Sequence, residues 1–184
     1  MERRSSKLRQ GWVFPLCVAM LILASCRPTE TEMIPPLRVV DHVDLNRYAG
    51  EWFEIARYPH SFQEGCLGSK TTYSLDDGRI AVVNECYEQT SAGPVRSVKG
   101  RARVVDRDTN AKLKVTFFWP FAGDYWIIDL DEEYQYAVVG HPKRKYLWIL
   151  ARTQQMDEKL YQDILMRLRE QRYDTAKLIR TLRK

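Results

Sequence analysis

Four cysteines are the residues of this 184-residue chain best able to form covalent bonds. A thiol can pack in a core, pair in a disulfide, act as a nucleophile or carry an attached group. Cys26 ends the apolar stretch LILASC at 21–26, and Cys17 lies within the apolar run that leads to it. Cys66 and Cys86 flank the segment GSKTTYSLDDGRIAVVNE. The segments around each cysteine therefore decide which use applies.

The N-terminal segment resembles an export signal that ends in a lipid-attachment site. After a basic start, about fifteen largely apolar residues run from Gly11 to Ser25, too few for a transmembrane helix, which needs roughly 20. The sequence LASC at 23–26 is similar to the lipobox of bacterial lipoproteins. This resemblance implies cleavage before Cys26, diacylation of that cysteine and acylation of its new amino group. The alternative is an ordinary signal peptide with a chance cysteine.

The domain boundaries and the charge follow from this interpretation. We expect a signal peptide at 1–25, a lipidated N-terminus and polar, Pro-containing tether at 26–42, and one folded domain at 43–184. The formal charge of the chain is +5, but residues 1–25 carry four basic residues against one acidic, which leaves only +2 on the remainder. A charge this small gives little reason to expect nucleic-acid binding.

The two remaining cysteines are expected to form a disulfide. An even number of cysteines in an exported chain favours pairing, and Asp77-Gly78 between them is a strong hairpin signal. A two-residue turn there places Cys86 opposite Ser69, so Cys66 must reach across from the loop before the strand. Two free buried thiols are the alternative. The sequence contains no CxxC motif and no histidine cluster, so a redox pair or a metal site is not supported.

The rest of the chain alternates in the manner of β-strands, as KLKVTFF at 112–118 illustrates. We expect a short helical turn at 44–50, then strands near 51–58, 69–75, 79–87, 96–105, 112–118, 125–130, 135–140 and 146–151. One amphipathic helix is expected at 157–170, with an apolar stripe of Leu160, Tyr161, Ile164, Leu165 and Leu168 against the outside of the sheet. Eight antiparallel strands avoid exposed edges by closing. The predicted fold is an all-β, eight-stranded up-and-down barrel that can hold one small ligand.

Alternation also predicts which residues line the barrel. Charged positions are assigned outward, so small residues on the opposite face of the fourth strand favour a hollow unless a bulky partner such as Phe117 or Trp126 fills it. For each position the alternative is ordinary core packing. The predicted lining residues are Tyr73, Val82, Asn84, Gly100, Ala102, Val115, Phe117, Trp126 and Ile128.

The sequence GEWFEIARYP at 50–59 resembles the lipocalin signature, Gly-x-Trp at the start of the first strand. TTYSLDDG, KLKVTFFWPFAGDYWIIDL, YAVVGHP and YLWILART extend the resemblance to the bacterial outer-membrane lipocalins of the Blc type, to which animal apolipoprotein D is related. It implies that Trp52, preceded by Gly50, plugs the closed end of the barrel, and that Arg152 packs across its ring. A second family motif, Thr-Asp-Tyr, is replaced here by DEEYQY, so no role is carried onto that segment.

The resemblance implies a binding protein for fatty acids or lysophospholipids, with no cofactor, anchored in the membrane through Cys26. Because Arg27 replaces the Asp associated with retention in the inner membrane, it implies the periplasmic face of the outer membrane. A lysophospholipid headgroup would lie at the mouth near 58–67, where Arg57 and Lys70 could meet a phosphate. The exact ligand and the number of subunits are not predicted.

Two other functions compete with this one. A packed barrel would act as a structural or partner-binding lipoprotein, and the aromatic WPF at 119–121 could form such a contact. An enzyme could use Glu54, which shares a strand face with the signature tryptophan, although pairing with a basic group is the commoner role. His42, His60 and His141 lack metal-ligand spacing, and a disulfide would remove the best nucleophile. No enzymatic activity and no metal site are therefore expected.

Overall fold

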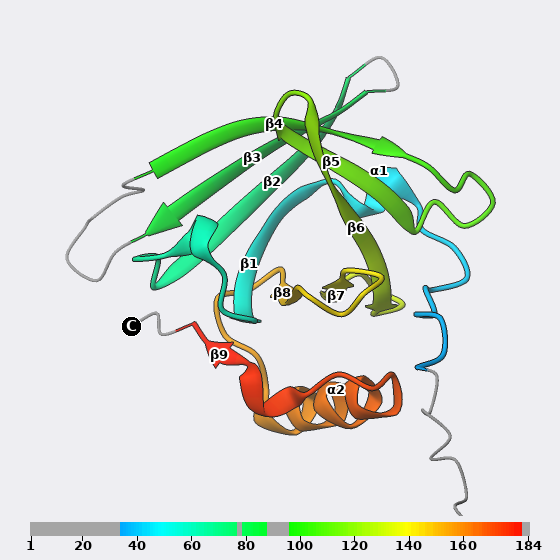
Figure 1. The fold of residues 1–184 in the computed structure, drawn as a ribbon, viewed down its shortest axis with the longest axis vertical. Helices are drawn as coiled ribbons and strands as arrows, with labels where there is room; N and C mark the ends of the chain where they lie inside the picture. Colours follow the sequence, from blue (N-terminus) through cyan, green and yellow to red (C-terminus); the bar gives the residue numbers. More distant parts are fainter. Residues whose placement is uncertain (1–33, 77–78, 88–95, 182–184) are drawn as a thin grey trace, which may run out of the picture. The chain divides into compact units, whose positions relative to one another are not determined.

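The computed structural model describes residues 34–76, 79–87 and 96–181. The predicted signal peptide at 1–25 and the predicted lipidation site Cys26 lie outside these residues. Figure 1 shows strands curving around a central space, with one helix on the outside. The helices and strands, in chain order, are α1 (Leu45–Tyr48), β1 (Gly50–Arg57), the 3-10 helix η1 (Ser61–Gln63), β2 (Gly68–Asp76), β3 (Arg79–Tyr87), β4 (Arg96–Val104), β5 (Lys112–Phe118), β6 (Phe121–Leu130), β7 (Tyr136–Gly140), β8 (Leu147–Ala151), α2 (Glu158–Glu170), the 3-10 helix η2 (Thr175–Lys177) and β9 (Ile179–Arg180).

Strands β1 to β8 form the closed antiparallel barrel that the sequence predicts. Each strand pairs with the next, and β1 pairs with both β8 and β2, which closes the sheet. The β2–β3 register places Ser69 opposite Cys86, as the two-residue turn predicts. The short strand β9 pairs with β1 at Ala56 and Arg57, beyond the point where β1 and β2 separate. In an up-and-down barrel, the β1–β2, β5–β6 and β7–β8 connections share one end, which we call the mouth.

Strand β6 begins four residues earlier than predicted. Residues 121–124 carry no apolar alternation, yet Phe121 pairs with Phe118 and Gly123 pairs with Val115. Backbone hydrogen bonds of a ladder form regardless of side-chain type, so a strand can continue where no face is buried. The connection between β5 and β6 is consequently only Trp119 and Pro120.

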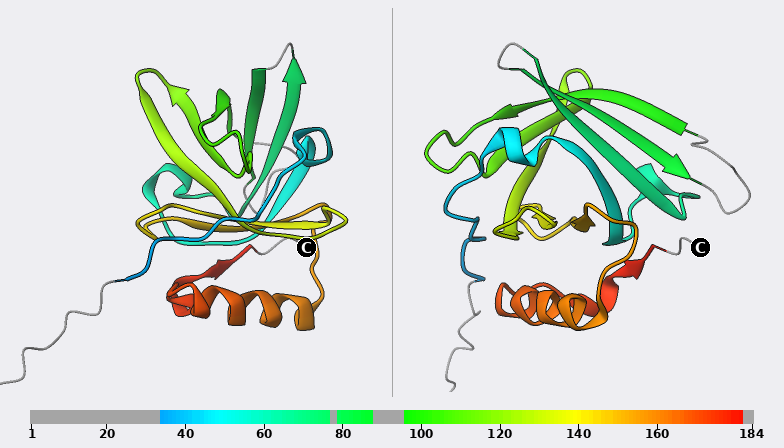
Figure 2. Two further views of the ribbon diagram at one scale, coloured as in Figure 1. Left: turned by 90° about the vertical axis from the view of Figure 1, so that its right-hand side faces the viewer. Right: turned by 180° about the vertical axis from the view of Figure 1, so that it is seen from behind.

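The core is divided into two clusters by the sheet. The inner cluster fills the barrel and includes Trp52, Tyr73, Val82, Leu113 and Ile127. The outer cluster lies between the sheet and α2 (Figure 2), and its helix residues are the predicted ones, Tyr161, Ile164, Leu165 and Leu168. Asp157 caps α2 by accepting a hydrogen bond from the backbone of Leu160 at 3.0 Å.

The segment predicted as a tether packs on the barrel over part of its length. Leu37 is buried in the outer cluster, and Val43 is completely buried in the inner one. The amide of Val40 donates to the carbonyl of Ile127 at 3.1 Å. The packed part of the chain therefore begins before residue 43, because alternating apolar residues in 37–43 bury against both clusters.

Candidate functional site: the barrel interior and its mouth

Most of the predicted lining residues face the barrel interior. Tyr73, Val82 and Ala102 are buried in the inner cluster, and Val115 and Phe117 pack against it. These positions follow the alternation of strands whose outward faces carry charged residues. Whether they contact a ligand stays a prediction.

Gly100 and Asn84 also have neighbours within the barrel. A Cβ atom on Gly100 would lie 2.6 Å from the ring of Phe117 and 2.7 Å from the carbonyl of Thr116. The small residue therefore accommodates a bulky one, which is the alternative that the sequence left open. The amide oxygen of Asn84 accepts a hydrogen bond from the hydroxyl of Thr71 across the β2–β3 pair.

Trp126 and Ile128 do not line the barrel, and that prediction is wrong. Ile128 is buried in the outer cluster under α2, and Trp126 packs against the same cluster. Their neighbours Tyr125 and Ile127 face inward instead. Strand β6 is apolar on both faces there, because one face lines the barrel and the other meets the helix. The sequence of this strand therefore does not show which side chains face the barrel interior and which face the helix.

Three tyrosines form a polar cluster inside the barrel near α1. The hydroxyl of Tyr73 donates to that of Tyr125 at 2.9 Å, and the hydroxyls of Tyr125 and Tyr48 lie 2.7 Å apart. Burial raises the pKa of each of the three phenols, so all stay protonated. Three hydroxyl protons share two hydrogen bonds, which leaves one donor available. Tyr48 and Tyr125 were not predicted as site residues, because their positions on α1 and β6 carry no sequence signal of a cluster.

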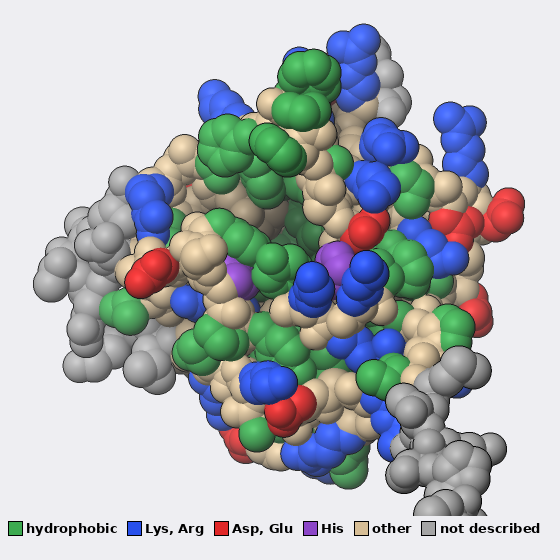
Figure 3. Space-filling view, viewed as in Figure 1, with side chains coloured by type: hydrophobic (Ala, Val, Ile, Leu, Met, Phe, Trp, Pro, Cys, Tyr) green, Lys and Arg blue, Asp and Glu red, His purple; other side chains and the backbone are tan. Residues whose placement is uncertain are grey.

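A small apolar cavity adjoins these tyrosines. Its volume of about 10 Å³ matches roughly one water molecule. Its walls come from α1 and from strands β2 to β6. This cavity is too small for an acyl chain, and Figure 3 shows a separate view onto a hollow bordered by hydrophobic side chains.

The closed end has the arrangement that the family resemblance implies. Trp52 is fully buried, and the guanidinium carbon of Arg152 lies 3.8 Å from the centre of its ring. Arg152 also donates to backbone carbonyls, at 2.8 Å to Glu51 and 2.6 Å to Arg47. Gly50 has a φ of +98°, and a Cβ atom there would lie 3.3 Å from Nη1 of Arg152. The backbone conformation therefore favours glycine, and the arginine leaves little room for a Cβ atom.

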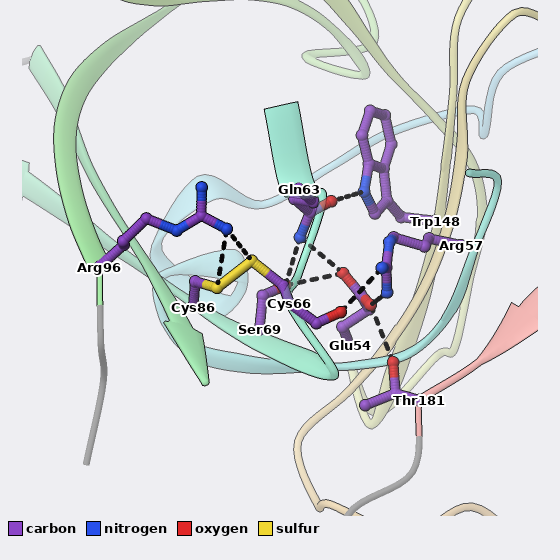
Figure 4. A network of polar contacts seen from close by, with 9 residues as sticks. All are labelled: Glu54, Arg57, Gln63, Cys66, Ser69, Cys86, Arg96, Trp148 and Thr181. Carbon is purple, nitrogen blue, oxygen red and sulfur yellow. Dashed lines mark hydrogen bonds and ion pairs between the residues drawn. A yellow bond between two sulfur atoms is a disulfide. The ribbon is translucent and has the colours of Figure 1, made fainter. Parts of the chain in front are cut away.

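A buried ion pair organises the opposite end of β1, at the mouth (Figure 4). A register shift lies between Glu54 and Ala56, and such a bulge breaks the two-residue alternation so that Glu54 and Arg57 meet. Nη1 of Arg57 donates to Oε1 of Glu54 at 2.7 Å, and the carboxylate side chain is completely buried. Nη2 donates to the carbonyl of Cys66 at 2.9 Å. Glu54 is therefore paired with a basic group, as expected for a structural carboxylate.

Three more donors surround the same carboxylate. Oε2 accepts from Nε2 of Gln63 at 2.9 Å and from Oγ of Ser69 at 2.7 Å. Oε1 accepts from Oγ1 of Thr181 at 2.8 Å. Gln63 in turn accepts from Nε1 of Trp148 at 3.1 Å. This network ties together the β1–β2 loop, β2, β8 and the C-terminal segment.

The predicted phosphate contacts at the mouth are wrong. Arg57 is 8 % exposed and is occupied by Glu54 and a backbone carbonyl. Lys70 lies on the face of β2 opposite to that of Ser69, with Nζ 2.7 Å from Oε1 of Glu51 and 3.0 Å from Oε2 of Glu85. Hydrogen bonds to these two carboxylates raise the pKa of Lys70. Both cations are already neutralised by carboxylates, which a prediction from sequence position could not detect.

Cys66 and Cys86 form the predicted disulfide, with their Cα atoms 5.5 Å apart. Cys66 lies in the loop before β2 and reaches across to β3, as the register requires. Nη2 of Arg96 lies 3.2 Å from the sulfur of Cys66 and donates to the carbonyl of Glu64 at 2.5 Å. The β1–β2 loop is therefore held by the disulfide at Cys66 and by the hydrogen-bond network around Glu54.

Aromatic rings surround a histidine in the same loop. The ring of His60 stacks on Phe62 with centroids 3.6 Å apart, and Trp148 lies 5.3 Å away. Burial, aided by the positive charge of Arg57, lowers the pKa of His60 to about 4. The imidazole is therefore neutral at physiological pH. Within the described ranges, no group of three or more His, Cys, Asp or Glu side chains could hold a metal ion.

The described chain contains no helix that is long and apolar enough to cross a membrane.

A closed eight-stranded up-and-down barrel with Gly-x-Trp at its base and one external helix defines the lipocalin class of fold. The chain belongs to the lipocalin-like family, whose domain it matches over residues 43–183. It is 40 % identical over 164 residues to outer membrane lipoprotein Blc of Escherichia coli (strain K12), covering 88 % of this chain and 89 % of that protein. It is 34 % identical over 132 residues to apolipoprotein D of Macaca fascicularis, covering 66 % of this chain and 66 % of that protein. Insecticyanin of the tobacco hornworm Manduca sexta shares the fold, with a TM-score of 0.67, 20 % identity, and coverage of 82 % of this chain and 86 % of that one.

Proposed function

We propose that this protein is a lipid-anchored lipocalin that binds fatty acids or lysophospholipids and stores or carries them at the bacterial cell envelope. The observation that carries the proposal is the closed barrel with an apolar inner cluster and a hollow at its mouth. Burial of an acyl chain there contributes about 0.8 kcal/mol per methylene. The 40 % identity to a protein named outer membrane lipoprotein Blc supports the same class of function.

The anchor is proposed on Cys26, with the signal peptide at 1–25 removed. One acyl chain binds a membrane only marginally, so the three chains of a bacterial lipoprotein would provide stable attachment. Arg27 and the name of the Blc relatives favour the periplasmic face of the outer membrane. Cys26→Ala should abolish metabolic labelling with palmitate and leave uncleaved precursor. Labelling equal to that of the unmodified chain would contradict the anchor.

Ligand binding is tested with a chain that begins at residue 27. Every residue of both core clusters follows residue 34, so this chain retains the whole barrel. Titration with lysophospholipids and fatty acids, followed by tryptophan fluorescence, should saturate near one ligand per barrel. Ala102→Trp should weaken binding because residue 102 faces the interior. Arg103→Trp, on the exposed face of the same strand, is the matched control and should bind normally.

A packed barrel that works through its surface is the second candidate function. The ring of Phe117 over Gly100 and the cavity of about 10 Å³ favour it. Absence of binding to either lipid class, with an intact barrel by circular dichroism, would support this alternative. Catalysis is not proposed, because the two cysteines within the described ranges are both in the disulfide and the buried carboxylate of Glu54 is fully paired.

A further inference from the structure

The turn between β5 and β6 projects three large aromatic side chains into solvent. Phe118, Trp119 and Phe121 are 71 %, 89 % and 78 % exposed. Phe118 and Phe121 are paired across the two strands, so the turn is supported by the sheet on both sides. We call these three residues the aromatic tip. A cluster of exposed aromatic residues marks an interaction surface, whereas single exposed apolar residues need no explanation.

The aromatic tip lies at the mouth together with other exposed apolar residues. Figure 2 shows the β5–β6 turn at the end of the barrel opposite α1. Phe62, in the β1–β2 connection at the same end, is 58 % exposed, and Ile34 is 64 % exposed. Ile34 lies beside Pro142 and Lys143 of the β7–β8 connection. The exposed apolar residues thus surround the entrance to the barrel.

Positive charge flanks the aromatic tip. Arg101 pairs with Thr116 across β4 and β5, so Lys99 and Phe118, each two residues nearer the mouth, lie on the same outward face. On the other side of β4, Lys99 and Arg101 face Val83 and Ala81 rather than carboxylates. Lys143 and Lys145, both exposed, add two cations from the β7–β8 connection. Among the described acidic residues of this end, Asp124 is paired with Lys114 at 2.8 Å, Asp174 lies 3.4 Å from Lys177, and Glu64 is exposed.

The N-terminal segment begins to pack on the barrel at the same end. Nη2 of Arg144, in the β7–β8 connection, donates to the carbonyl of Pro35 at 2.8 Å. Cys26 precedes Ile34 by eight residues, which span at most about 28 Å when extended. A lipid on Cys26 would therefore keep Ile34, at the mouth, within about 28 Å of the membrane surface.

We propose that the mouth end docks on an anionic phospholipid bilayer, with the aromatic tip in the interface and Lys99 and Arg101 against lipid phosphates. Aromatic rings with adjacent cations are the pattern of interfacial membrane binding. The inference extends the proposed function, because the barrel would open onto the membrane that supplies its acyl ligand. The tip and the cations would nevertheless bind lipid without the anchor. A protein partner is the alternative occupant of this surface. The membrane is favoured because Ile34, through which the chain leads to the proposed anchor at Cys26, lies at the same end of the barrel.

The first experiment measures cosedimentation of the chain from residue 27 with vesicles of phosphatidylethanolamine and phosphatidylglycerol at low salt. We expect the double variant Trp119→Ala with Phe121→Ala to bind at least about tenfold more weakly, because each ring buries apolar area in the interface. Lys99→Gln with Arg101→Gln should weaken binding by a similar factor and reduce its salt dependence. Met166→Ala on α2 and Arg107→Gln near the closed end remove an exposed apolar residue and an exposed cation away from the mouth. Both controls should bind like the unmodified chain.

The second experiment measures insertion directly. Vesicles that contain phosphatidylglycerol and brominated phosphatidylcholine should quench part of the tryptophan fluorescence. Trp119→Phe keeps an aromatic ring in the tip, so it should still cosediment but lose most of the quenching. Quenching equal to that of the unmodified chain would show that another tryptophan contacts the lipid, which contradicts the proposed orientation.

The outcomes separate this inference from the proposed function. No binding of the unmodified chain to anionic vesicles, or equal binding by the tip variant, would overturn the docking surface. A change from dimer to monomer in the tip variant, measured by analytical ultracentrifugation, would assign the tip to an interface between copies of this chain and also overturn it. The tip variants should keep normal affinity for soluble lysophospholipid in vesicle-free titrations. Loss of lysophospholipid binding by every chain, with vesicle binding intact, would contradict the ligand proposal alone.

Discussion

Replacing Glu54 by glutamine tests whether its ion pair with Arg57 stabilises the folded barrel. The carboxylate accepts four hydrogen bonds from side chains, two on each oxygen. Glutamine keeps the volume but has one oxygen, so two of the four donors face an amide nitrogen and lose their acceptor. Arg57 would also become a buried cation without a counter-charge. Removing one partner of a buried ion pair costs about 3–5 kcal/mol.

A double-mutant cycle separates the ion pair from simple loss of packing. Arg57→Met should also cost about 3–5 kcal/mol, because it leaves Glu54 as an uncompensated buried anion. The double variant Glu54→Gln with Arg57→Met removes both charges, so we expect it to be no less stable than either single variant. The coupling free energy should therefore reach at least about 3 kcal/mol, the cost of either single variant.

The assay is urea unfolding of the chain from residue 27, followed by far-ultraviolet circular dichroism with linear extrapolation of the free energy. Lys159→Gln, at a pair on α2 whose lysine is 87 % exposed, is the control and should change the free energy by less than about 0.5 kcal/mol. Additive costs for Glu54→Gln and Arg57→Met, within about 0.5 kcal/mol, would refute the reasoning, because independent effects show no coupling.

Three further predictions concern the disulfide, the buried histidine and the closed end. Cys66→Ala with Cys86→Ala should lower the free energy of unfolding by about 3 kcal/mol in urea, because the unfolded chain regains loop entropy; an unchanged midpoint would contradict this. His60 has a native pKa of about 4, below its unfolded value of about 6.5. Linkage over this pKa difference gives about 2.6 kcal/mol between pH 6.5 and 4, and solvent screening at the partly exposed ring reduces it, so stability should fall by about 1–2 kcal/mol as the pH drops over that range. His60→Phe should remove that part of the pH dependence, and an identical pH profile would exclude His60 as its source. Arg152→Ala should cost about 2–3 kcal/mol in thermal or urea unfolding, because it removes charge-assisted hydrogen bonds and the stacking on Trp52. Arg152→Lys should recover little of this loss, since a single ammonium cannot reach several carbonyls, and full recovery would show that charge alone suffices.

Much of the fold could be predicted because local patterns and the closed barrel agree. The strand bounds differ from prediction by at most one residue, except at the start of β6. A two-residue turn at Asp77-Gly78 predicts the register that the β2–β3 pairing shows, with Ser69 opposite Cys86, and with it the position from which Cys66 reaches its partner. The inward orientation of Tyr73 and Val82 could be predicted because their strands are apolar on one face and polar on the other.

The lining predictions that were wrong, Trp126 and Ile128, lie on β6, where one face of the strand lines the barrel and the other packs against α2. Ile128 and Tyr125 both look apolar in the sequence, and only the packing of α2 decides which of them faces the barrel. The pairing of Glu54 with Arg57 depends on a bulge, which shifts side chains by one residue and carries no composition signal.

The amino-acid sequence determines the alternation, the turn and the cysteine pair, because these depend on neighbours within a few residues. The tertiary structure decides which apolar face of a strand lines the barrel and which is covered by α2, because that depends on where the helix packs. It also decides that Gly100 lies under the ring of Phe117, and that the aromatic tip, its flanking cations and the N-terminal segment meet at one end of the barrel. These contacts join residues distant in the chain, so closure of the barrel is the physical step that brings them together.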